Sequence, residues 1–180
     1  MQMALVVAAC VVGPVSPQKG PVSEAFIKEA LTYRRMVPLH KERVDMDKAT
    51  ATLCAPASQA FGPHYKPFIR TYVTAGALVK PLPKKGQIDL PVGTMLVKEK
   101  YDTVSAETPS IITAMKKLRK GKGSGVWEFG MIDLKTKKEI RATKQPCASC
   151  HSQWSVNDGI SYQTAALMRS RKAAPEIRKK

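Results

Sequence analysis

The chain has 180 residues, with 30 Lys and Arg against 14 Asp and Glu, and a formal net charge of +16. A hydrophobic fraction of 43% is enough for one modest core, so the length and composition predict one domain and exclude an acidic disordered protein, a collagen-like chain and a disulfide miniprotein. No apolar stretch approaches the roughly 20 residues that cross a bilayer. The positive charge is compatible with nucleic acid, a membrane surface or an acidic protein as partner, and does not choose among them.

Residues 1–22 are interpreted as an export signal and linker. The apolar residues 3–13 have the length of the core of a secretory signal, although no Lys or Arg precedes Lys19. Residues 7–10, Val-Ala-Ala-Cys, resemble a lipoprotein signal in which Cys10 becomes the lipid-anchored residue. The sequence therefore predicts a periplasmic or otherwise extracytoplasmic protein, with a lipid anchor at Cys10 as an open option and a frayed apolar arm as the alternative.

The following residues predict helices and then strands. Ser23 is a candidate N-cap for a helix that runs towards Met36 and is stopped by Pro38, and a second short helix is expected around residues 45–54. The apolar period then changes from 3.6 to 2, which predicts strands at residues 68–74, 94–102, 110–118, 126–133 and 139–143. Their short connections favour an antiparallel meander. The sequence thus predicts an α+β domain over residues 23–165, with a five-stranded antiparallel sheet and flanking N-terminal helices, followed by a basic tail at 166–180.

The most specific motif is the segment 147–151, Cys-Ala-Ser-Cys-His. The chain has four cysteines and three histidines, and three of these seven residues fall within five positions. Cys-x-x-Cys-His is the attachment signature of a c-type haem. Two intervening residues place Cys147 and Cys150 along one edge of a helical turn, so that each thiol can add to one haem vinyl group while His151 reaches the iron from the same side. The sequence predicts one covalently attached haem c on a C-terminal haem-attachment segment.

Three other interpretations of the motif stay open. A thioredoxin-like dithiol is expected after a buried strand of a βαβ unit, whereas this motif follows a Lys-rich segment near the end of the chain. A zinc site needs four ligands, and only Cys54, His40 and His64 remain to complete one, none of them paired in sequence. The third interpretation is a structural disulfide. If haem occupies the motif, Cys54 is expected to be a buried, inert thiol.

With this motif after a predicted antiparallel sheet, the sequence resembles the cytochrome P-460 family, which includes the β-sheet form of cytochrome c-prime. The matching stretches are residues 53–56, 72–73, 90–100 and 127–133, together with Cys147–His151. The resemblance implies a haem held on a five-stranded antiparallel sheet, a mostly five-coordinate iron, a homodimer and an extracytoplasmic location. Some members carry a lysine joined covalently to the haem and oxidise hydroxylamine, while others bind small gases such as nitric oxide. The chain departs from the family at residues 158–162, Asp-Gly-Ile-Ser-Tyr.

Two neighbouring residues in the strand at 94–102 are candidate catalytic residues. Lys98 is the best match for the cross-linking lysine, although strand alternation places it with Leu96 and Lys100 on a face that reads as solvent-exposed. Glu99 falls on the more apolar face, where a buried carboxylate needs a partner. It is expected either to move protons near the haem or to form an ion pair at the end of the sheet.

Three apolar residues at alternate positions are candidate cofactor-binding residues. Trp127, Phe129 and Met131 share one face of the strand at 126–133, where they form either an apolar wall beside the haem or ordinary sheet core. A sixth iron ligand could come from one of four side chains, and each has an ordinary structural alternative. These four are Met131, Met168, His40 and His64.

The basic run at residues 116–122 lacks interleaved aromatic side chains, so nucleic-acid binding is not expected. It is interpreted as a solvated strand end or a docking patch for an acidic redox partner. The sequence therefore predicts an extracytoplasmic mono-haem c-type cytochrome that transfers electrons or binds small nitrogen-oxide ligands such as nitric oxide. The alternative is a hydroxylamine-oxidising enzyme with a haem cross-link at Lys98.

Overall fold

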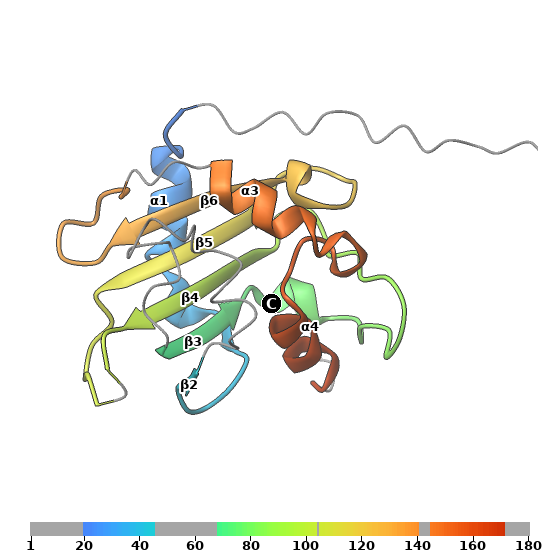
Figure 1. The fold of residues 1–180 in the computed structure, drawn as a ribbon, viewed down its shortest axis with the longest axis horizontal. Helices are drawn as coiled ribbons and strands as arrows, with labels where there is room; N and C mark the ends of the chain where they lie inside the picture. The colour runs from blue at the N-terminus through green and yellow to red at the C-terminus, as the bar shows by residue number, and fades with distance from the viewer. Residues whose placement is uncertain (1–19, 46–67, 104, 141–144, 172–180) are drawn as a thin grey trace, which may run out of the picture.

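The computed structural model describes residues 20–45, 68–103, 105–140 and 145–171. One antiparallel sheet lies at its centre, with helix α1 on one face and helices α3 and α4 on the other (Figure 1). The mixed α+β class predicted from the sequence is therefore confirmed. The predicted helix at 45–54, Cys10, Cys54 and His64 fall wholly or mainly outside the described residues, and so does most of the predicted export segment.

Helix α1 spans Glu24–Ala30 and begins where the sequence predicts. The Ser23 side chain accepts a hydrogen bond from the backbone N–H of Phe26 at 3.1 Å, which satisfies one donor of the first helical turn. The predicted extension to Met36 is wrong, because the helix ends at Ala30, with Leu31 as its C-cap, and a 3-10 turn follows at Tyr33–Arg35. This turn brings the Tyr33 side chain down onto the sheet, where it is buried.

The sheet has six strands rather than the predicted five. Its order is β1-β3-β4-β5-β6, with β2 also paired to β3, and every pairing is antiparallel. Strands β3 to β6 form the predicted meander. The bounds of the strands are Val37–Pro38 for β1, Val44–Asp45 for β2, Phe68–Val73 for β3, Met95–Tyr101 for β4, Ile111–Lys117 for β5 and Trp127–Asp133 for β6.

The differences in strand number have simple causes. Strands β1 and β2 have two residues each and are held by long-range pairing with β3. They are too short to show the period-two alternation by which strands are predicted from sequence. The predicted strand at 139–143 is reduced, in the part that the structure describes, to an isolated bridge between Glu139 and Ile132. The predicted turn before it is present, since Lys137 adopts a left-handed φ of 56°.

The face of the sheet that carries α1 has its own apolar core. Phe26 and Ala30 of the helix pack there with Met95, Val97 and Ile112 of the strands. Gly130 in β6 permits this close approach, because a Cβ at that position would lie 2.7 Å from Cε1 of Phe26. Helix α1 is thus seated directly on β6.

The opposite face is covered by α3, Gln145–Ser152, and α4, Tyr162–Arg169. The prediction that Leu96, Lys98 and Lys100 face solvent is therefore wrong. Leu96 is 3% exposed, Lys100 is 1% exposed and Lys98 is half-buried. The alternation along β4 was predicted correctly. The prediction of which face is exposed failed, because the C-terminal helices that cover this face lie far from β4 in the sequence.

The C-terminal boundary of the domain also moves. Helix α4 buries Ala165 and Met168 in the core on the α3 side, and the Arg169 guanidinium donates to the carbonyls of Pro83 and Gly86. Residues 166–171 therefore belong to the fold and not to a solvated tail. No helix within the described ranges is both long and apolar enough to span a bilayer.

Candidate functional site

Helix α3 carries the whole Cys-x-x-Cys-His motif. Cys147 and Cys150 are three residues apart and His151 is four residues beyond Cys147, so the three side chains lie on neighbouring positions of one helix surface. Cys147 is half-buried against the apolar core on this face of the sheet, whereas Cys150 is buried against Trp154. The helix therefore buries Cys150 and leaves Cys147 and the imidazole of His151 half-buried.

Three contacts fix the imidazole of His151. Its Nδ1 donates a hydrogen bond to the carbonyl oxygen of Gly159 at 2.5 Å. Its ring lies 4.9 Å from the ring of Phe129 and 5.1 Å, at 89°, from the indole of Trp154. Because Nδ1 is committed to a carbonyl, Nε2 is the ring nitrogen that can bind a metal.

The electrostatics keep this imidazole neutral at pH 7. Burial among apolar groups is the main cause that lowers the pKa of His151 to about 4; the hydrogen bond to Gly159 opposes this shift, and the positive charge of Lys98 adds a smaller lowering to it. A neutral imidazole is the form that coordinates iron. The same interaction shows that Lys98 on β4 lies within electrostatic reach of His151.

A half-buried strip of the sheet lies beside the motif. Lys98, Thr113 and Met131 stand in register across β4, β5 and β6, and each is half-buried. The neighbouring row on the same face, Leu96, Met115 and Phe129, is buried. Since Phe129 of the buried row contacts His151, the half-buried strip lies one row further along the same sheet face.

The predicted apolar residues of β6 share this face, as expected. Phe129 touches the His151 ring, and Met131 belongs to the half-buried strip. Trp127 is buried under the turn that follows α3, where a Cβ on Gly159 would lie 3.6 Å from its Nε1. Trp127 and Phe129 are thus part of the sheet core, as one of the two interpretations expects, and Phe129 also contacts His151; the apolar wall beside a haem stays a prediction.

Glu99 lies on the other face of the sheet, away from α3. Its carboxylate is 1% exposed and accepts hydrogen bonds from three tyrosine hydroxyls, and Arg34 Nε lies 3.7 Å away. The distances are 2.6 Å from Tyr33, 3.0 Å from Tyr72 and 2.7 Å from Tyr101. This arrangement supports the ion-pair interpretation of Glu99 and disfavours a role in proton transfer at His151.

The other candidate iron ligands that the structure describes have structural roles. His40 Nδ1 donates to the carbonyl of Glu42 and its Nε2 accepts from the backbone N–H of Thr71, so the ring bridges two segments at the edge of β3. Met168 is 1% exposed and packs in the core. His64 lies outside the described residues.

The alternative metal and dithiol sites gain no support. Within residues 20–45, 68–103, 105–140 and 145–171, no three His, Cys, Asp or Glu side chains gather as ligands of a metal ion. The sheet is antiparallel throughout, so α3 is not the helix of a βαβ unit.

Sequence reasoning missed the residues that support the motif from outside it. Gly159 supplies the carbonyl for His151, and its φ of +79° follows a φ of +57° at Asp158. The Asp-Gly pair signals a turn in the sequence, but nothing in the sequence indicates that the turn folds back onto His151. Lys117 was grouped with a solvated basic run, yet it is 1% exposed and bound to Asp158 at 2.6 Å.

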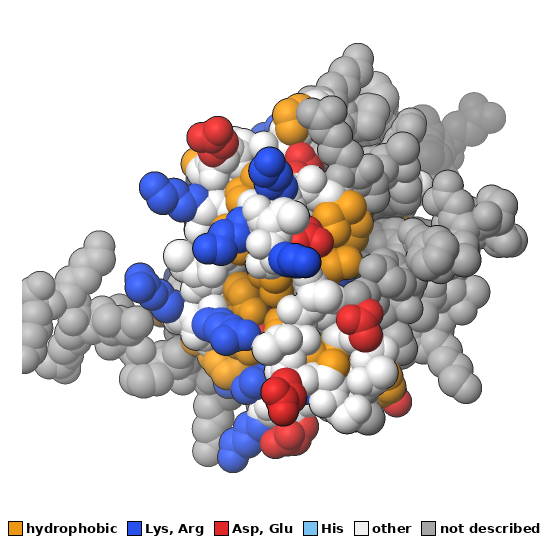
Figure 2. Space-filling view, turned by 90° about the vertical axis from the view of Figure 1, so that its left-hand side faces the viewer, with side chains coloured by type: hydrophobic (Ala, Val, Ile, Leu, Met, Phe, Trp, Pro, Cys, Tyr) orange, Lys and Arg blue, Asp and Glu red, His pale blue; other side chains and the backbone are white. Residues whose placement is uncertain are grey.

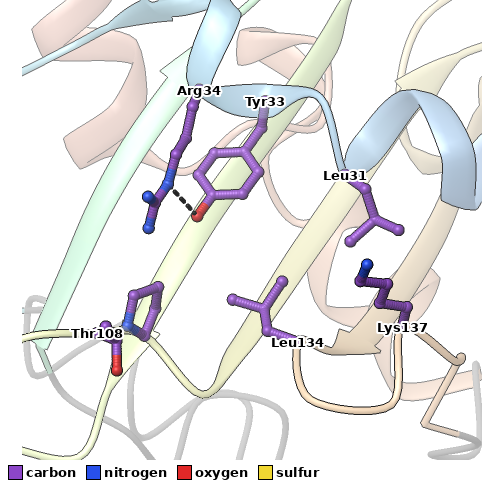
Figure 3. Close-up of a pocket in the computed structure, with 7 residues that line it drawn as sticks. Leu31, Tyr33, Arg34, Thr108, Leu134 and Lys137 are labelled. Carbon is purple, nitrogen blue, oxygen red and sulfur yellow. Dashed lines mark hydrogen bonds between the residues drawn. The ribbon is translucent and has the colours of Figure 1, made fainter.

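A separate pocket of about 370 Å³ lies on the α1 side. Figure 3 shows Tyr33 and Arg34 joined by a hydrogen bond on one wall, and Lys137 reaching in from the turn after β6. The other lining residues are Leu31, Thr108, Pro109 and Leu134. None of the residues of the Cys-x-x-Cys-His motif lines this pocket, so it is distinct from the site on α3.

Comparison with models of known protein families and with curated proteins found no match. The function is therefore argued from the motif and its surroundings.

Proposed function

We propose that the chain is an extracytoplasmic mono-haem c-type cytochrome of the cytochrome P-460 type, which transfers electrons or binds a small nitrogen-oxide ligand such as nitric oxide. Cys147 and Cys150 would hold one haem c by thioether bonds, and His151 would bind its iron. The observation that carries the proposal is a Cys-x-x-Cys-His helix whose histidine is held by a carbonyl at Nδ1.

The residues present fit such a group. A neutral imidazole with Nδ1 donating to Gly159 has the tautomer that leaves Nε2 for a metal. Phe129 and Met131 offer apolar surface next to it, and the half-buried strip on the sheet gives a planar group a surface against which to lie. A bound haem would supply one-electron redox chemistry and, where no protein side chain takes the sixth position, a place for a small ligand.

The proposal is tested by a visible spectrum of the purified full-length chain, produced together with a c-type haem maturation system. We expect oxidised and reduced spectra of a c-type haem, a pyridine haemochrome in which both vinyl groups are saturated, and a haem stain that survives denaturing electrophoresis. A colourless protein with no stain would overturn the proposal and favour the dithiol or zinc interpretation.

A second candidate function is hydroxylamine oxidation with Lys98 joined to the haem. The observation that favours it is the position of Lys98, half-buried on the same sheet face as α3 and close enough for its charge to lower the pKa of His151. The strand pattern alone placed Lys98 on a solvent-exposed face, which disfavoured a bond to the haem. In the structure Lys98 lies on the covered face, and this objection to the cross-link no longer applies.

The Lys98→Arg variant tests this candidate. Arginine keeps the positive charge but lacks a primary amine, so it cannot form the same bond to the haem. If the cross-link exists, the wild-type chain yields a Lys98 peptide that stays attached to haem after digestion, with a red-shifted ferrous band, and the variant loses both features together with hydroxylamine oxidation. A variant with an unchanged spectrum and turnover would dismiss the enzyme and leave the electron-transfer or gas-binding cytochrome.

We also propose an acidic redox partner, and a homodimer, which the resemblance to the cytochrome P-460 family implies. Figure 2 shows Lys and Arg side chains spread over one side of the molecule, with hydrophobic side chains and several Asp and Glu among them. This pattern, with the net charge of +16, is compatible with electrostatic docking of an acidic protein. The basic surface is smaller than the sequence suggests, because Lys117 is buried and Lys116 is bound to Glu29 at 2.5 Å.

A further inference from the structure

A buried ion pair lies directly behind the turn that holds His151. The Lys117 ammonium at the end of β5 donates to Asp158 Oδ2 at 2.6 Å and to Asp89 Oδ1 at 2.8 Å. Lys117 is 1% exposed and Asp158 is fully buried, whereas the Asp89 side chain is 70% exposed. Burial raises the pKa of the Asp158 carboxyl and the ammonium opposes this rise, while Lys117 lowers the pKa of Asp89.

Asp158 ties three parts of the fold to one carboxylate. The oxygen that binds Lys117 also accepts a hydrogen bond from the backbone N–H of Leu90 at 2.9 Å. The same loop is joined to the turn a second time, since the N–H of Ile88 donates to the carbonyl of Val156. The turn after α3 is thus fixed to the end of β5 through the Asp158 carboxylate, and to the loop before β4 through that carboxylate and the Ile88–Val156 hydrogen bond.

The next residue in the chain is the one that orients the imidazole. Gly159 donates its N–H to the carbonyl of Trp154 and accepts from His151 Nδ1. Two consecutive left-handed residues, Asp158 and Gly159, give the turn the shape that aims this carbonyl at α3. A shift of the Asp158 carboxylate therefore moves the carbonyl that His151 uses.

We propose that the Lys117–Asp158 pair is a positioning device, which sets the strength of the hydrogen bond between His151 Nδ1 and the Gly159 carbonyl and through it the donor strength of His151 towards the iron. This inference rests on the proposed function, because it concerns the histidine as an iron ligand. A strong hydrogen bond at Nδ1 makes the imidazole a better donor, which stabilises ferric over ferrous iron. Lys117 and Asp158 act through Gly159 and do not contact the ligand themselves.

The test is the Asp158→Asn variant of the full-length haem-loaded protein. Asparagine tolerates the left-handed conformation, so the substitution removes the charge and weakens the bond to Lys117 without changing the turn type. We expect the iron–histidine stretching band of the reduced protein to move to lower frequency and the midpoint potential to rise. Lys117→Gln keeps a donor opposite Asp158 and should move the iron–histidine band in the same direction by less. Because it removes a positive charge, which by itself lowers the potential, the band is the readout for this variant. It serves as the second variant if Asp158→Asn is not recovered with haem.

Asp89→Asn is the matched control. It removes one negative charge from the same ammonium, but Asp89 is exposed and does not lie in the turn that carries Gly159. We expect an unchanged iron–histidine band and at most a small rise in potential from the lost charge. Equal bands and equal potentials in Asp158→Asn and Asp89→Asn would overturn the positioning role while leaving the cytochrome intact. A wild-type chain without haem would instead overturn the proposed function.

Discussion

Replacing Cys147 and Cys150 together by alanine is expected to abolish covalent haem attachment completely. Both thioether bonds are lost, and neither α3 nor the neighbouring sheet contains another cysteine among the described residues. Haem staining after denaturing electrophoresis should disappear. Each single variant should keep one thioether and give a pyridine haemochrome band shifted to longer wavelength, because one vinyl group stays conjugated with the ring.

Two comparisons make this result specific. Cys54→Ala should stain as strongly as the wild type, because Cys54 is outside the motif. His151→Ala should keep the covalent stain but lose the wild-type ligand set, so its oxidised and reduced spectra should change while its pyridine haemochrome does not. Undiminished staining of the double cysteine variant would rule out the assignment of the motif.

Replacing Glu99 by leucine is expected to lower the free energy of unfolding by about 3–5 kcal/mol, the range for removing one partner from a buried charged network. The hydroxyls of Tyr33, Tyr72 and Tyr101 all donate to this carboxylate, and all three side chains are buried. Leucine leaves these donors without an acceptor in an apolar environment. Glu99→Gln retains one acceptor oxygen and should lose less stability.

The measurement is chemical denaturation monitored by circular dichroism, with Glu107→Gln as the control. Glu107 is exposed, so its neutralisation should change stability by no more than about 0.5 kcal/mol. The visible haem spectrum of Glu99→Gln should be nearly that of the wild type, since Glu99 lies on the face of the sheet opposite to α3. A large spectral change in this variant with little loss of stability would show instead that Glu99 acts at the haem.

The same cluster predicts a loss of stability at high pH. Burial and the nearby Glu99 carboxylate raise the pKa of Tyr72 from 10.0 to about 12, and the pKa values of Tyr33 and Tyr101 are also raised. The folded state therefore holds these protons more tightly than the unfolded state. The stability they contribute is complete below pH 10 and is lost as the pH rises through about 12 for Tyr72. Tyr72→Phe should flatten this part of the pH profile.

Much of the sheet could be read directly from the sequence. The period-two pattern of β3, β4, β5 and β6 places alternate residues on opposite faces, and this assigned Trp127, Phe129 and Met131 to one face correctly. Strands β1 and β2 could not be found in this way, because their two-residue segments depend on partners in β3 about 25 to 35 residues away. Local pattern carries no information about such pairing.

The burial of Lys100 and Lys117 also could not be predicted from local sequence pattern. A lysine in a strand is normally solvated, so Lys100 and Lys117 read as surface residues. Both are buried: Lys117 is bound to Asp158, which the turn at residues 154–161 supplies, and Lys100 lies within the sheet between Ile69 of β3 and Ile111 of β5. Only the packing of distant segments shows that these charges are internal.

The sequence by itself determined the reactive groups of the candidate site, the Cys-x-x-Cys-His motif at residues 147–151. The spacing of these residues along one helix is a local property of the chain. The tertiary structure alone decided which groups surround that motif. It placed Phe129 against the imidazole, aimed the Gly159 carbonyl at Nδ1, put Lys98 on the sheet face that carries α3 and moved Glu99 to the far face. These are contacts between elements separated in the chain, fixed by burial and hydrogen bonding of the folded core, and local spacing cannot specify them.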